Sequence, residues 1–385
     1  IKLNILKEIS NSDNIPFKTK INKASINSKE IRRNDVFFAI KGKKNDGNLY
    51  IKEAFKRGAS LAIINKSEKK PKQIKVKNTL KFLTKASSLL RENSQSKIVA
   101  ITGSCGKTSL KELVGKTLNK INNTTYSQKS FNNKYGVPIS LFNLKQNDEF
   151  GIFEVGMDKK GEIDHLTKII KPDVGVITNI SYAHAKNFKN IKEIALAKSE
   201  IIKNIRDGGN LVLNADDKFY NFHKRIAQKK NITVYSFSIK KKSSDINLNY
   251  IKKNKHKYKV SLNINNLKKL FYINSNFEND IKNLLAAVSI ISIFIDIMKL
   301  DCDIFYNHKT PNGRGDISKI KAFKKFFYLI DESYNSNPLS LSSALKNFDM
   351  MRVNKSKKHL VLGDMLELGK HSKRLHVAIS KNINN

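Results

Sequence analysis

The stretch Lys97–Ser109 reads KIVAITGSCGKTS, and it decides how the middle of the chain folds. A short apolar run leads into a turn of small residues, which is followed by Gly106, Lys107 and Thr108. This is the order of a β-strand, a phosphate-binding loop and the first turn of a helix. The usual P-loop pattern is G-x-x-x-x-G-K-[ST], and Ile101 stands where its first glycine is expected. Two interpretations follow, a nucleotide site with a variant loop or an ordinary strand–turn–helix connection.

The nucleotide interpretation assigns a role to each residue of the loop. Backbone N–H groups of Ser104 to Thr108, at a helix N-terminus, would point at phosphate oxygens. Lys107 would neutralise the β and γ phosphates, and the Thr108 hydroxyl would contact Mg²⁺. We favour this interpretation because the strand before the loop and the helix after it supply the context that the motif requires. The predicted nucleotide-binding residues of the loop are Gly103, Ser104, Cys105, Gly106, Lys107, Thr108 and Ser109.

Length and composition predict a protein of several domains without a membrane span. The 385 residues correspond to two or three domains. The most apolar stretch, Asn283–Met298, is shorter than a membrane helix and carries Asp296, so we expect a core helix there. The first residues lack the apolar core of a signal peptide, and two cysteines argue against a disulfide framework. We therefore expect a cytoplasmic protein.

The net charge of +40 raises the question of a nucleic-acid partner. Only nine of the 73 basic residues are arginines, whereas grooves that read phosphates or bases use arginine prominently. The lysines are spread over the whole chain, which indicates a compositional drift that covers every solvated face. We predict no nucleic-acid partner, although the charge favours small polyanions such as nucleotides. The alternative, a nucleotide-dependent nucleic-acid binder, predicts a strongly salt-dependent affinity for DNA.

Three regions separate by pattern, and we predict domains at residues 1–80, 81–309 and 310–385. The first region has strand-like runs around one helical run. In the second, strands and helices alternate, which predicts parallel βαβ units with a buried sheet. The lysine-rich segment 240–269 interrupts this alternation and is expected to form a surface hairpin. The third region reads strand, helix and a second strand at 358–369, and we expect this domain to be incomplete because two parallel strands are not self-sufficient.

Two polar residues follow neighbouring strands of the predicted parallel sheet. Glu154 ends the apolar run FGIFEVGM, and His184 follows GVITNIS. Open α/β sheets bind ligands at the carboxyl ends of their strands. A carboxylate at the end of a buried strand costs free energy unless it is paired, hydrogen-bonded or bound to a metal. Taken alone, each residue is more often structural, but together, beside a phosphate loop, they predict ligands of a divalent ion.

Lys198 lies in a predicted helix that covers residues 191–205. Its neighbours at helical spacing include Ile194, Ile201 and Ile202, which are apolar. A lysine on an apolar face either extends its ammonium to the solvent or has a function. From the residues alone we favour the first of these, a side chain that reaches the solvent.

Several segments, taken together and in this order, resemble the Mur ligases, the ATP-dependent amide-forming enzymes of peptidoglycan synthesis. The family's loop reads T-G-[small]-x-G-K-T without the first P-loop glycine, so Ile101 agrees with it. The segments are TGSCGKTS, FEVGMDKKGEIDHL, PDVGVITNISYAH, ALAKSEI, NLLAAVSI, GRGDI, IDESYNSNP and VLGDMLELG.

Within this family, DESYNSNP and LGDMLELG are similar to the ligases that join D-alanyl-D-alanine to UDP-N-acetylmuramoyl-tripeptide. The resemblance implies a three-domain α/β fold, with a UDP-substrate domain, a central ATP-binding domain around a parallel P-loop-type sheet, and a truncated Rossmann-like C-terminal domain. It implies amide formation through an acyl phosphate, with ATP and Mg²⁺. We expect a monomer, although the sequence is nearly silent on oligomeric state. Either diaminopimelate or lysine remains open as the third residue of the tripeptide. The alternatives are another amino-acid ligase of the superfamily or an inactive fragment.

The resemblance also implies a role for individual residues. Lys198 falls on the lysine that CO₂ carbamylates in this family, which replaces our interpretation from the residues alone. The implied catalytic residues are Lys107, Glu154, His184 and Lys198, with Thr108, Glu154, His184 and Lys198 around the metal ions. The other implied contacts are Asn283 to adenine, Arg314 to the nucleotide phosphates, Asp331 to ribose, and Ser28, Asn132, Asn133, Asn335 and Asn337 to the peptide and uridine substrates.

The sequence departs from the family pattern at four places. Cys105 stands where asparagine is common, and we expect tolerance because the loop acts through its backbone. Asn279-Asp280 replaces His-Asn before the adenine-binding residue, and Glu332 replaces an aspartate. Asn27-Ser28-Lys29 replaces Asp-Ser-Arg near the uridine site, which removes the bidentate contacts of an arginine.

Overall fold

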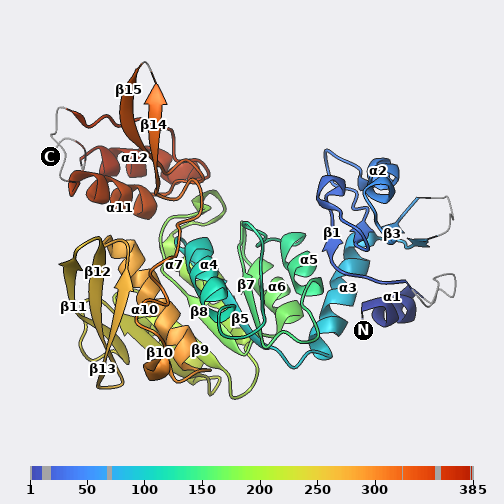
Figure 1. The fold of residues 1–385 in the computed structure, drawn as a ribbon, viewed down its shortest axis with the longest axis horizontal. Helices are drawn as coiled ribbons and strands as arrows, with labels where there is room; N and C mark the ends of the chain where they lie inside the picture. Colours follow the sequence, from blue (N-terminus) through green and yellow to red (C-terminus); the bar gives the residue numbers. More distant parts are fainter. Residues whose placement is uncertain are drawn as a thin grey trace.

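The computed structural model describes residues 2–10, 19–66, 72–322, 324–351, 357–381 and 383. Its three sheets follow one another along the chain, and Figure 1 shows the N-terminal and the last parts on opposite sides of a broad central part. The sheets lie within the three domains predicted from the sequence, whose boundaries stay a prediction. In the described part of the chain, no helix combines the length and apolarity needed to cross a bilayer.

The N-terminal sheet has four parallel strands in chain order. Alternate residues of one strand face opposite sides: Phe37 joins a small cluster with Ala54 of α2, whereas Phe38 joins the large cluster that includes Leu83 of α3. Helix α1 (Lys2–Ser10) packs against α3. The other elements are β1 (Ala24–Ser25), β2 (Val36–Phe38), α2 (Ile51–Lys56), β3 (Leu61–Ile64), β4 (Gln73–Lys75) and α3 (Thr79–Glu92).

The central sheet has nine strands in the order β13-β12-β11-β10-β9-β8-β5-β7-β6. From β6 to β11 all neighbours are parallel, as predicted, and β12 and β13 add an antiparallel extension. The strands are β5 (Lys97–Thr102), β6 (Thr124–Tyr126), β7 (Phe150–Glu154), β8 (Val174–Ile177), β9 (Asn210–Asn214), β10 (Thr233–Ser238), β11 (Ile246–Asn254), β12 (Lys257–Ile264) and β13 (Leu267–Ile273).

Helices cover both faces of this sheet, which is why its inner strands are apolar throughout. In β5, Val99 and Ile101 pack in the cluster with α4 and α10, while Ile98 and Ala100 face the cluster with the remaining helices. The helices on one face are α4 (Lys107–Leu118) and α10 (Glu278–Ser292). Those on the other face are α5 (Gly136–Phe142), α6 (Glu162–Ile170), α7 (Ile191–Lys198), α8 (Glu200–Lys203) and α9 (Tyr220–Gln228).

The lysine-rich segment forms the predicted hairpin, but as part of the central sheet. Strands β11 and β12 pair antiparallel, while β11 also pairs parallel with β10. Isolated two-stranded hairpins are marginally stable in water, and attachment to a sheet with apolar faces supplies the missing contacts. The expected helix over 191–205 is likewise divided at Ser199 into α7 and α8.

The third region contains β14 (Asp316–Ala322), β15 (Lys325–Asp331), α11 (Pro338–Asp349) and α12 (Ser372–Ser380). The predicted strand and helix correspond to β15 and α11, and β15 pairs antiparallel with β14. The second predicted strand, at 358–369, is wrong: the described structure assigns no strand there, and Val361 is 95% exposed. A strand requires a neighbour for its ladder hydrogen bonds, and β14 and β15 pair with each other.

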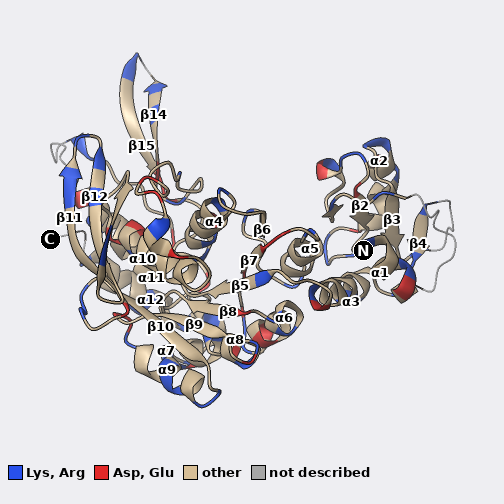
Figure 2. Cartoon of the chain, turned by 60° about the horizontal axis from the view of Figure 1, so that its bottom comes forward, with Lys and Arg blue, Asp and Glu red and all other residues tan. Residues whose placement is uncertain are grey.

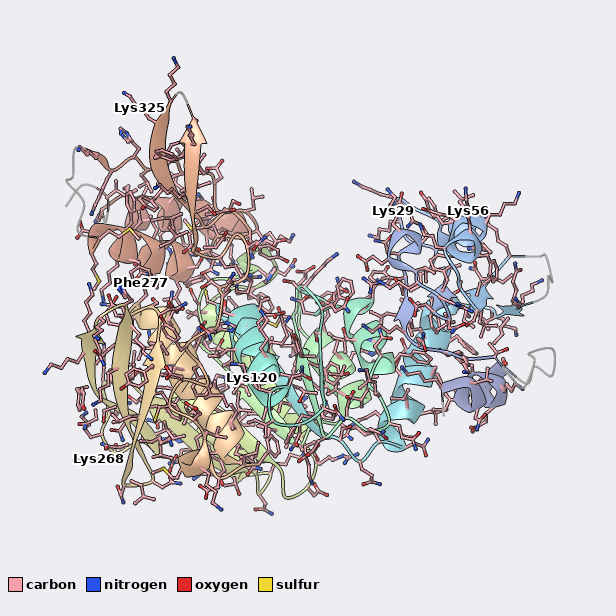
Figure 3. The ribbon with its side chains drawn as sticks, in the orientation of Figure 1. Lys29, Lys56, Lys120, Lys268, Phe277 and Lys325 are labelled. Atoms are coloured by element: carbon pink, nitrogen blue, oxygen red, sulfur yellow. The ribbon has the colours of Figure 1, made fainter. Side chains whose placement is uncertain are left out.

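Basic side chains are distributed over all three regions, as the composition predicted. Figure 2 shows lysines and arginines on most elements rather than along one stripe. In Figure 3 the labelled Lys29, Lys56, Lys120, Lys268 and Lys325 lie on separate elements, and all five are exposed. The basic residues of the described structure therefore cover several faces, and the prediction about a nucleic-acid partner stays a prediction.

Arg91, fully buried at the end of α3, connects this helix to the central sheet. Its guanidinium donates to the carbonyls of Ile170 and Lys171 at 2.9 Å and to the Asp173 carboxylate at 3.0 Å. Burial lowers the pKa of Arg91 to about 10, which leaves it charged at neutral pH. The guanidinium of Arg91 therefore connects α3 to the end of α6 and, through Asp173, to the start of β8.

We expect Arg91→Met to lower the free energy of unfolding by about 3 kcal/mol, because the carbonyls of Ile170 and Lys171 lose a charged donor and the Asp173 carboxylate loses one of its donors. Arg57→Met is the matched control, since Arg57 is exposed and pairs with Glu53 in the preceding turn. Its effect should stay within about 0.5 kcal/mol. Urea unfolding measures both, and equal effects of the two substitutions would contradict the prediction.

Candidate active site

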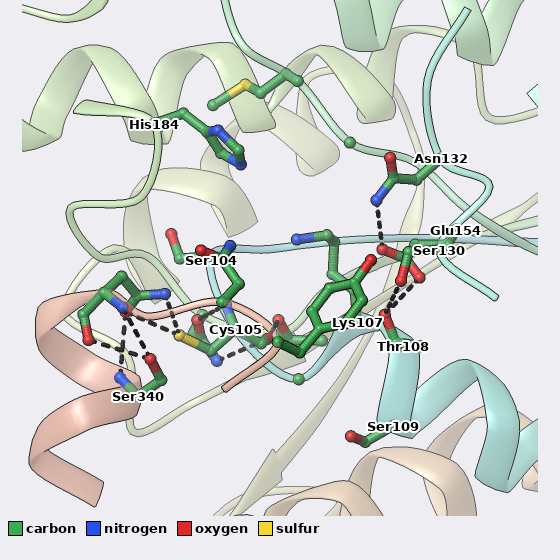
Figure 4. Close-up of a pocket in the computed structure, with 18 of the residues that line it drawn as sticks. Ser104, Cys105, Lys107, Thr108, Ser109, Ser130, Asn132, Glu154, His184 and Ser340 are labelled. Carbon is green, nitrogen blue, oxygen red and sulfur yellow. Dashed lines mark hydrogen bonds between the residues drawn. The ribbon is translucent and has the colours of Figure 1, made fainter. Parts of the chain in front are cut away.

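A cavity of about 1010 Å³ lies at the carboxyl ends of the central strands. Residues of the loop after β5 line it together with residues from the turns after β7 and β8 and from α10. Residues between Ser130 and Tyr135 also line it, and a further wall comes from the third region, between Thr310 and Ser340. Figure 4 shows the residues of this cavity around the loop. The cavity therefore lies where an open α/β sheet is expected to bind its ligand.

The loop after β5 depends on two glycines. Gly103 has a φ of 147°, and a Cβ atom at this position would overlap the Thr178 hydroxyl of the strand next to it. Gly106 has a φ of 81° and precedes the first residue of α4. Glycine adopts these angles without a steric cost. The loop consequently turns sharply against the end of β8 and directs the N-terminus of α4 into the cavity.

Asn179 holds this loop through three hydrogen bonds. The Ser104 N–H donates to the Asn179 carbonyl at 3.0 Å, and the Cys105 N–H donates to the Asn179 side-chain oxygen at 2.9 Å. The Asn179 amide donates in turn to the Cys105 carbonyl at 3.2 Å. Two of the N–H groups predicted to face phosphate are thus used inside the protein. Those at the start of α4 lack intrahelical acceptors and remain available to an anion.

Two lysines converge on the carbonyl oxygen of Gly103. Lys107 Nζ donates to it at 2.9 Å and Lys198 Nζ at 3.0 Å. Lys198 is 1% exposed, so the first interpretation, in which it reached the solvent, is wrong. Burial lowers the pKa of Lys198 well below its usual range, and the positive charge of Lys107 lowers it further. The Lys198 amine therefore lies in the interior behind the loop, where burial disfavours its charged form.

Glu154, the last residue of β7, is a buried carboxylate that contacts the first turn of α4. Its Oε2 accepts from the Thr108 hydroxyl at 2.8 Å and its Oε1 from the Asn132 amide at 2.7 Å. Ser130 lies beside them, with 3.4 Å between the Ser130 and Thr108 hydroxyl oxygens. Figure 4 shows these side chains gathered together, away from His184. Carboxylate, hydroxyl and amide oxygens are the ligands that Mg²⁺ prefers, so this group suits a hard cation.

His184 meets two carboxylates instead of joining Glu154. Its Nδ1 lies 3.1 Å from Asp158 Oδ1 and 2.5 Å from Oε2 of Glu367, which belongs to the third region. Burial lowers the pKa of His184, although the two carboxylates act in the opposite direction. Ligand atoms of the three residues lie within 4.8 Å of one another. Such a set of nitrogen and oxygen ligands could hold a divalent cation.

The third region contributes charged and aromatic groups to the cavity. The Arg314 guanidinium carbon lies 4.1 Å from the centre of the Tyr334 ring, and Arg314 donates to the Ser130 hydroxyl at 3.3 Å. Partial burial and the nearby Asp280 carboxylate raise the pKa of Glu332 to about 7. The wall from this region therefore combines a fixed cation with a carboxyl group that titrates near neutral pH.

Asn337 brings the first turn of α11 against the loop. Its amide nitrogen lies 3.1 Å from the Cys105 sulfur, and its side-chain oxygen caps α11 through the N–H groups of Leu339 and Ser340. The thiol of Cys105 thus fits in the loop, because the contacts of this residue with Asn179 use its backbone N–H and carbonyl rather than its side chain.

The structure brings together most of the residues predicted for the site. Four of them do not line the cavity. Gly103 lies at the start of the loop and Lys198 donates to its carbonyl from behind the loop, while Asp331 accepts a hydrogen bond from Ser333 and Ser28 donates to Glu53 in the N-terminal part. Those that line it are Ser104, Cys105, Gly106, Lys107, Thr108, Ser109, Asn132, Asn133, Glu154, His184, Asn283, Arg314, Asn335 and Asn337.

Sequence reasoning missed several residues of the site. Asn179 and Glu367 lie in segments that carried the family resemblance, whereas Ser130 lies outside the segments quoted above, and none of the three was assigned a role. Glu332 and Asp280 were noted as departures from the family, and both line the cavity. Asp158 follows Glu154 by four residues in a turn, a position that no periodic pattern marks.

Comparison with known proteins agrees with this geometry. Residues 101–291 match the Mur ligase middle domain, and residues 20–96 match the Mur ligase family catalytic domain. The chain belongs to the Mur ligase family. A relative from Rickettsia prowazekii, the UDP-N-acetylmuramoyl-tripeptide–D-alanyl-D-alanine ligase, is 36% identical over 96% of this chain and 80% of its own length. The ligase of the same name from Buchnera aphidicola (pea-aphid strain) is 34% identical over 94% of this chain and 79% of its own length.

Solved structures of such ligases have the same fold. MurF from Acinetobacter baumannii superposes with a TM-score of 0.83 and 26% identity, over 99% of this chain and 82% of that one. MurF from Thermotoga maritima, solved in complex with ADP, has a TM-score of 0.79 and 26% identity, over 97% of this chain and 83% of that one. These similarities confirm the α/β fold class predicted from the sequence.

We predict that Gly103→Ala weakens nucleotide binding at least about tenfold, which corresponds to about 1.4 kcal/mol. The added methyl group overlaps the Thr178 hydroxyl and must displace the loop. Gly208→Ala is the control: Gly208 also has a positive φ, 71°, but a methyl group there would meet no described atom within 4 Å. Titration with a fluorescent ADP analogue measures both variants, and a normal affinity in a folded Gly103→Ala protein would refute the prediction.

Proposed function

We propose that this chain is an ATP-dependent ligase that joins D-alanyl-D-alanine to UDP-N-acetylmuramoyl-tripeptide in peptidoglycan synthesis. The cavity carries this proposal, because it combines a phosphate-binding loop with polar groups from the third region. Relatives of the chain that are named for this reaction match nearly its whole length. We propose that the three regions act as a UDP-substrate domain, an ATP-binding domain and a C-terminal ligase domain of a cytoplasmic monomer.

The reaction requires two anions to meet. A carboxylate of the tripeptide attacks the γ-phosphorus of ATP, the bond from this phosphorus to the β,γ-bridging oxygen breaks, and ADP leaves. The amine of the dipeptide then attacks the acyl phosphate, and inorganic phosphate leaves as the amide bond forms. Lys107, at the start of α4, would neutralise the transferred phosphoryl group. Catalysis by this site is chiefly positioning and charge neutralisation.

We infer that Mg²⁺ assists this reaction by reducing the repulsion between carboxylate and phosphates. The buried Glu154 supports one ion, since its side chain accepts hydrogen bonds from a hydroxyl and an amide, which leave its negative charge uncompensated. Thr108 and Glu154 would hold this ion. His184 would hold a second one, together with a carbamate formed on Lys198.

The surroundings of Lys198 support this carbamate. CO₂ reacts with a neutral amine: the Nζ lone pair forms a bond to carbon, and a proton leaves Nζ. Burial favours the neutral form of the Lys198 amine, and Gly103 accepts its hydrogen bond beside the loop. The product is a carboxylate-like anion, which would also compensate the charge of Lys107.

Other substrate contacts follow from the walls of the cavity. Asn283, beside Gly106, would contact adenine, and Arg314 would contact the nucleotide phosphates. For the ribose we propose Glu332 in place of Asp331, because Glu332 lines the cavity while an Asp331 oxygen accepts from the Ser333 N–H. The peptide and uridine contacts remain as proposed from the sequence, with Asn335 and Asn337 on the dipeptide side, and Asn132, Asn133 and Ser28 toward the UDP-substrate.

One assay tests the reaction. Phosphate release from ATP is measured with UDP-N-acetylmuramoyl-tripeptide, in the presence and absence of D-alanyl-D-alanine. We expect release that needs both substrates, because the acyl phosphate turns over only when the amine accepts the acyl group. Replacing the dipeptide by a single amino acid tests the alternative ligase. Release that is indifferent to the dipeptide would contradict the proposed function.

We predict that Lys198→Ala abolishes most ligase activity and that millimolar acetate or formate restores part of it. The small carboxylate would fill the space of the lost side chain and supply the anion expected from the carbamate. Lys203→Ala is the control, since Lys203 lies on the next helix and is exposed. Activity is measured as phosphate release with both substrates, and an unimpaired Lys198→Ala enzyme would rule out the carbamate.

A further inference from the structure

We propose that Lys111 is a positioning residue, which holds the segment 127–133 so that Ser130 and Asn132 meet Thr108 and Glu154. Lys111 lies on α4, one helical turn after Lys107, and its side chain is fully buried. It does not line the cavity and contacts no reacting group, so its influence on the site passes through this segment.

All three N–H donors of the Lys111 ammonium have partners. Nζ donates to the carbonyls of Ser127 at 2.6 Å and Lys129 at 2.9 Å, and to the Glu112 carboxylate at 2.6 Å. Glu112 compensates the buried charge, while the two carbonyls are drawn toward one point. The geometry therefore uses a buried cation to gather backbone oxygens from a segment outside its own helix.

The segment has a conformation that requires such support. Lys129 has a φ of 50°, in the left-handed region that residues with a side chain rarely adopt. Its carbonyl points to Lys111, and its own ammonium pairs with Glu30 of the N-terminal region at 2.8 Å. Without the ammonium of Lys111, two carbonyls would lose a charged donor, and the left-handed turn would lose one of the contacts that hold it.

This segment carries the partners of the buried carboxylate. The Glu154 N–H donates to the Ser127 hydroxyl at 3.2 Å, and the Asn132 amide donates to Glu154 Oε1 at 2.7 Å. Ser130 lies next to the Thr108 hydroxyl and accepts from Arg314 of the third region. A displacement of the segment would leave Glu154 and Thr108 in place but alter the groups that orient them.

Loss of the Lys111 ammonium is expected to weaken the binding of Mg²⁺ more than the binding of the nucleotide. This expectation rests on the proposed function, in which Thr108 and Glu154 hold a Mg²⁺ ion. Groups that orient metal ligands typically change metal affinity about 10- to 100-fold when they are removed. The N–H groups at the start of α4 and Lys107 do not depend on the segment. Lys111 variants should therefore alter the Mg²⁺ requirement more than the affinity for the nucleotide itself.

The test compares Lys111→Met, Lys111→Gln and Lys111→Arg with Lys116→Met. Lys116 is a matched control because it lies on α4, pairs with the same Glu112, and is exposed. Binding of a fluorescent ADP analogue is titrated without Mg²⁺ and then as a function of Mg²⁺, and urea unfolding establishes which variants are folded.

We expect Lys111→Met or Lys111→Gln to raise the half-maximal Mg²⁺ concentration about tenfold. Binding without Mg²⁺ should stay within about twofold of the unaltered protein, which a general structural defect would not allow. Lys111→Arg should recover part of the loss, because arginine also donates to carbonyls. Lys116→Met should behave as the unaltered protein does.

A second variant separates positioning from stability. In an Asn132→Ala background, Lys111→Gln should have little further effect on the Mg²⁺ requirement, because the contact that it positions is already absent. Independent, additive effects, or a folded Lys111→Gln protein with a normal Mg²⁺ titration, would overturn the inference. A different result would contradict the proposed function but not the inference about Lys111. In that case the Lys111 variants change the Mg²⁺ titration as expected, while the unaltered protein has no ligase activity.

Discussion

The close approach of Gly103 to Thr178 is the constraint on which the site depends. The loop after β5 passes so near the end of β8 that a Cβ atom at position 103 would overlap the Thr178 hydroxyl. This approach lets Thr178 and Asn179 bind the Cys105 carbonyl, and it presents the Gly103 carbonyl to Lys107 and Lys198. The start of α4 then faces the cavity, with its N–H groups and Thr108 directed at the same space.

The charges of the site are arranged around that loop in two groups. Lys107 and Lys198 converge on one carbonyl oxygen, and burial disfavours the charged form of Lys198. Glu154 lies in the other group, where hydroxyl and amide donors satisfy its oxygens. A polyanionic nucleotide would complement the lysines and a hard cation would complement Glu154, because each is opposite in sign to the charge that the protein leaves uncompensated. The third region adds Arg314, so the site requires segments that lie far apart in the sequence.

Much of the central fold was predictable because its signals are local. Buried runs such as Ile98–Thr102 and Phe150–Glu154 read as strands of a parallel sheet, and strand ends marked the loop, Glu154 and His184. The direction of the Lys198 side chain was not predictable from its apolar neighbours, because both exposed and buried lysines occur among such residues. The strand expected near Val361 failed because a strand needs a ladder partner, which its own residues do not specify. Glu332 and Asp331 are adjacent, and only the path of the chain decides which one faces the cavity.

The sequence by itself determined the class of fold, the nucleotide loop and the resemblance to the Mur ligases, since these follow from periodicity and from residue types at fixed spacing. The tertiary structure decided which side chains meet. His184 lies with Asp158 and Glu367 rather than with Glu154, and Lys111 gathers the carbonyls of Ser127 and Lys129. The physical reason is that such contacts depend on distances between segments, which packing of the sheet and its helices sets, and no local pattern encodes them.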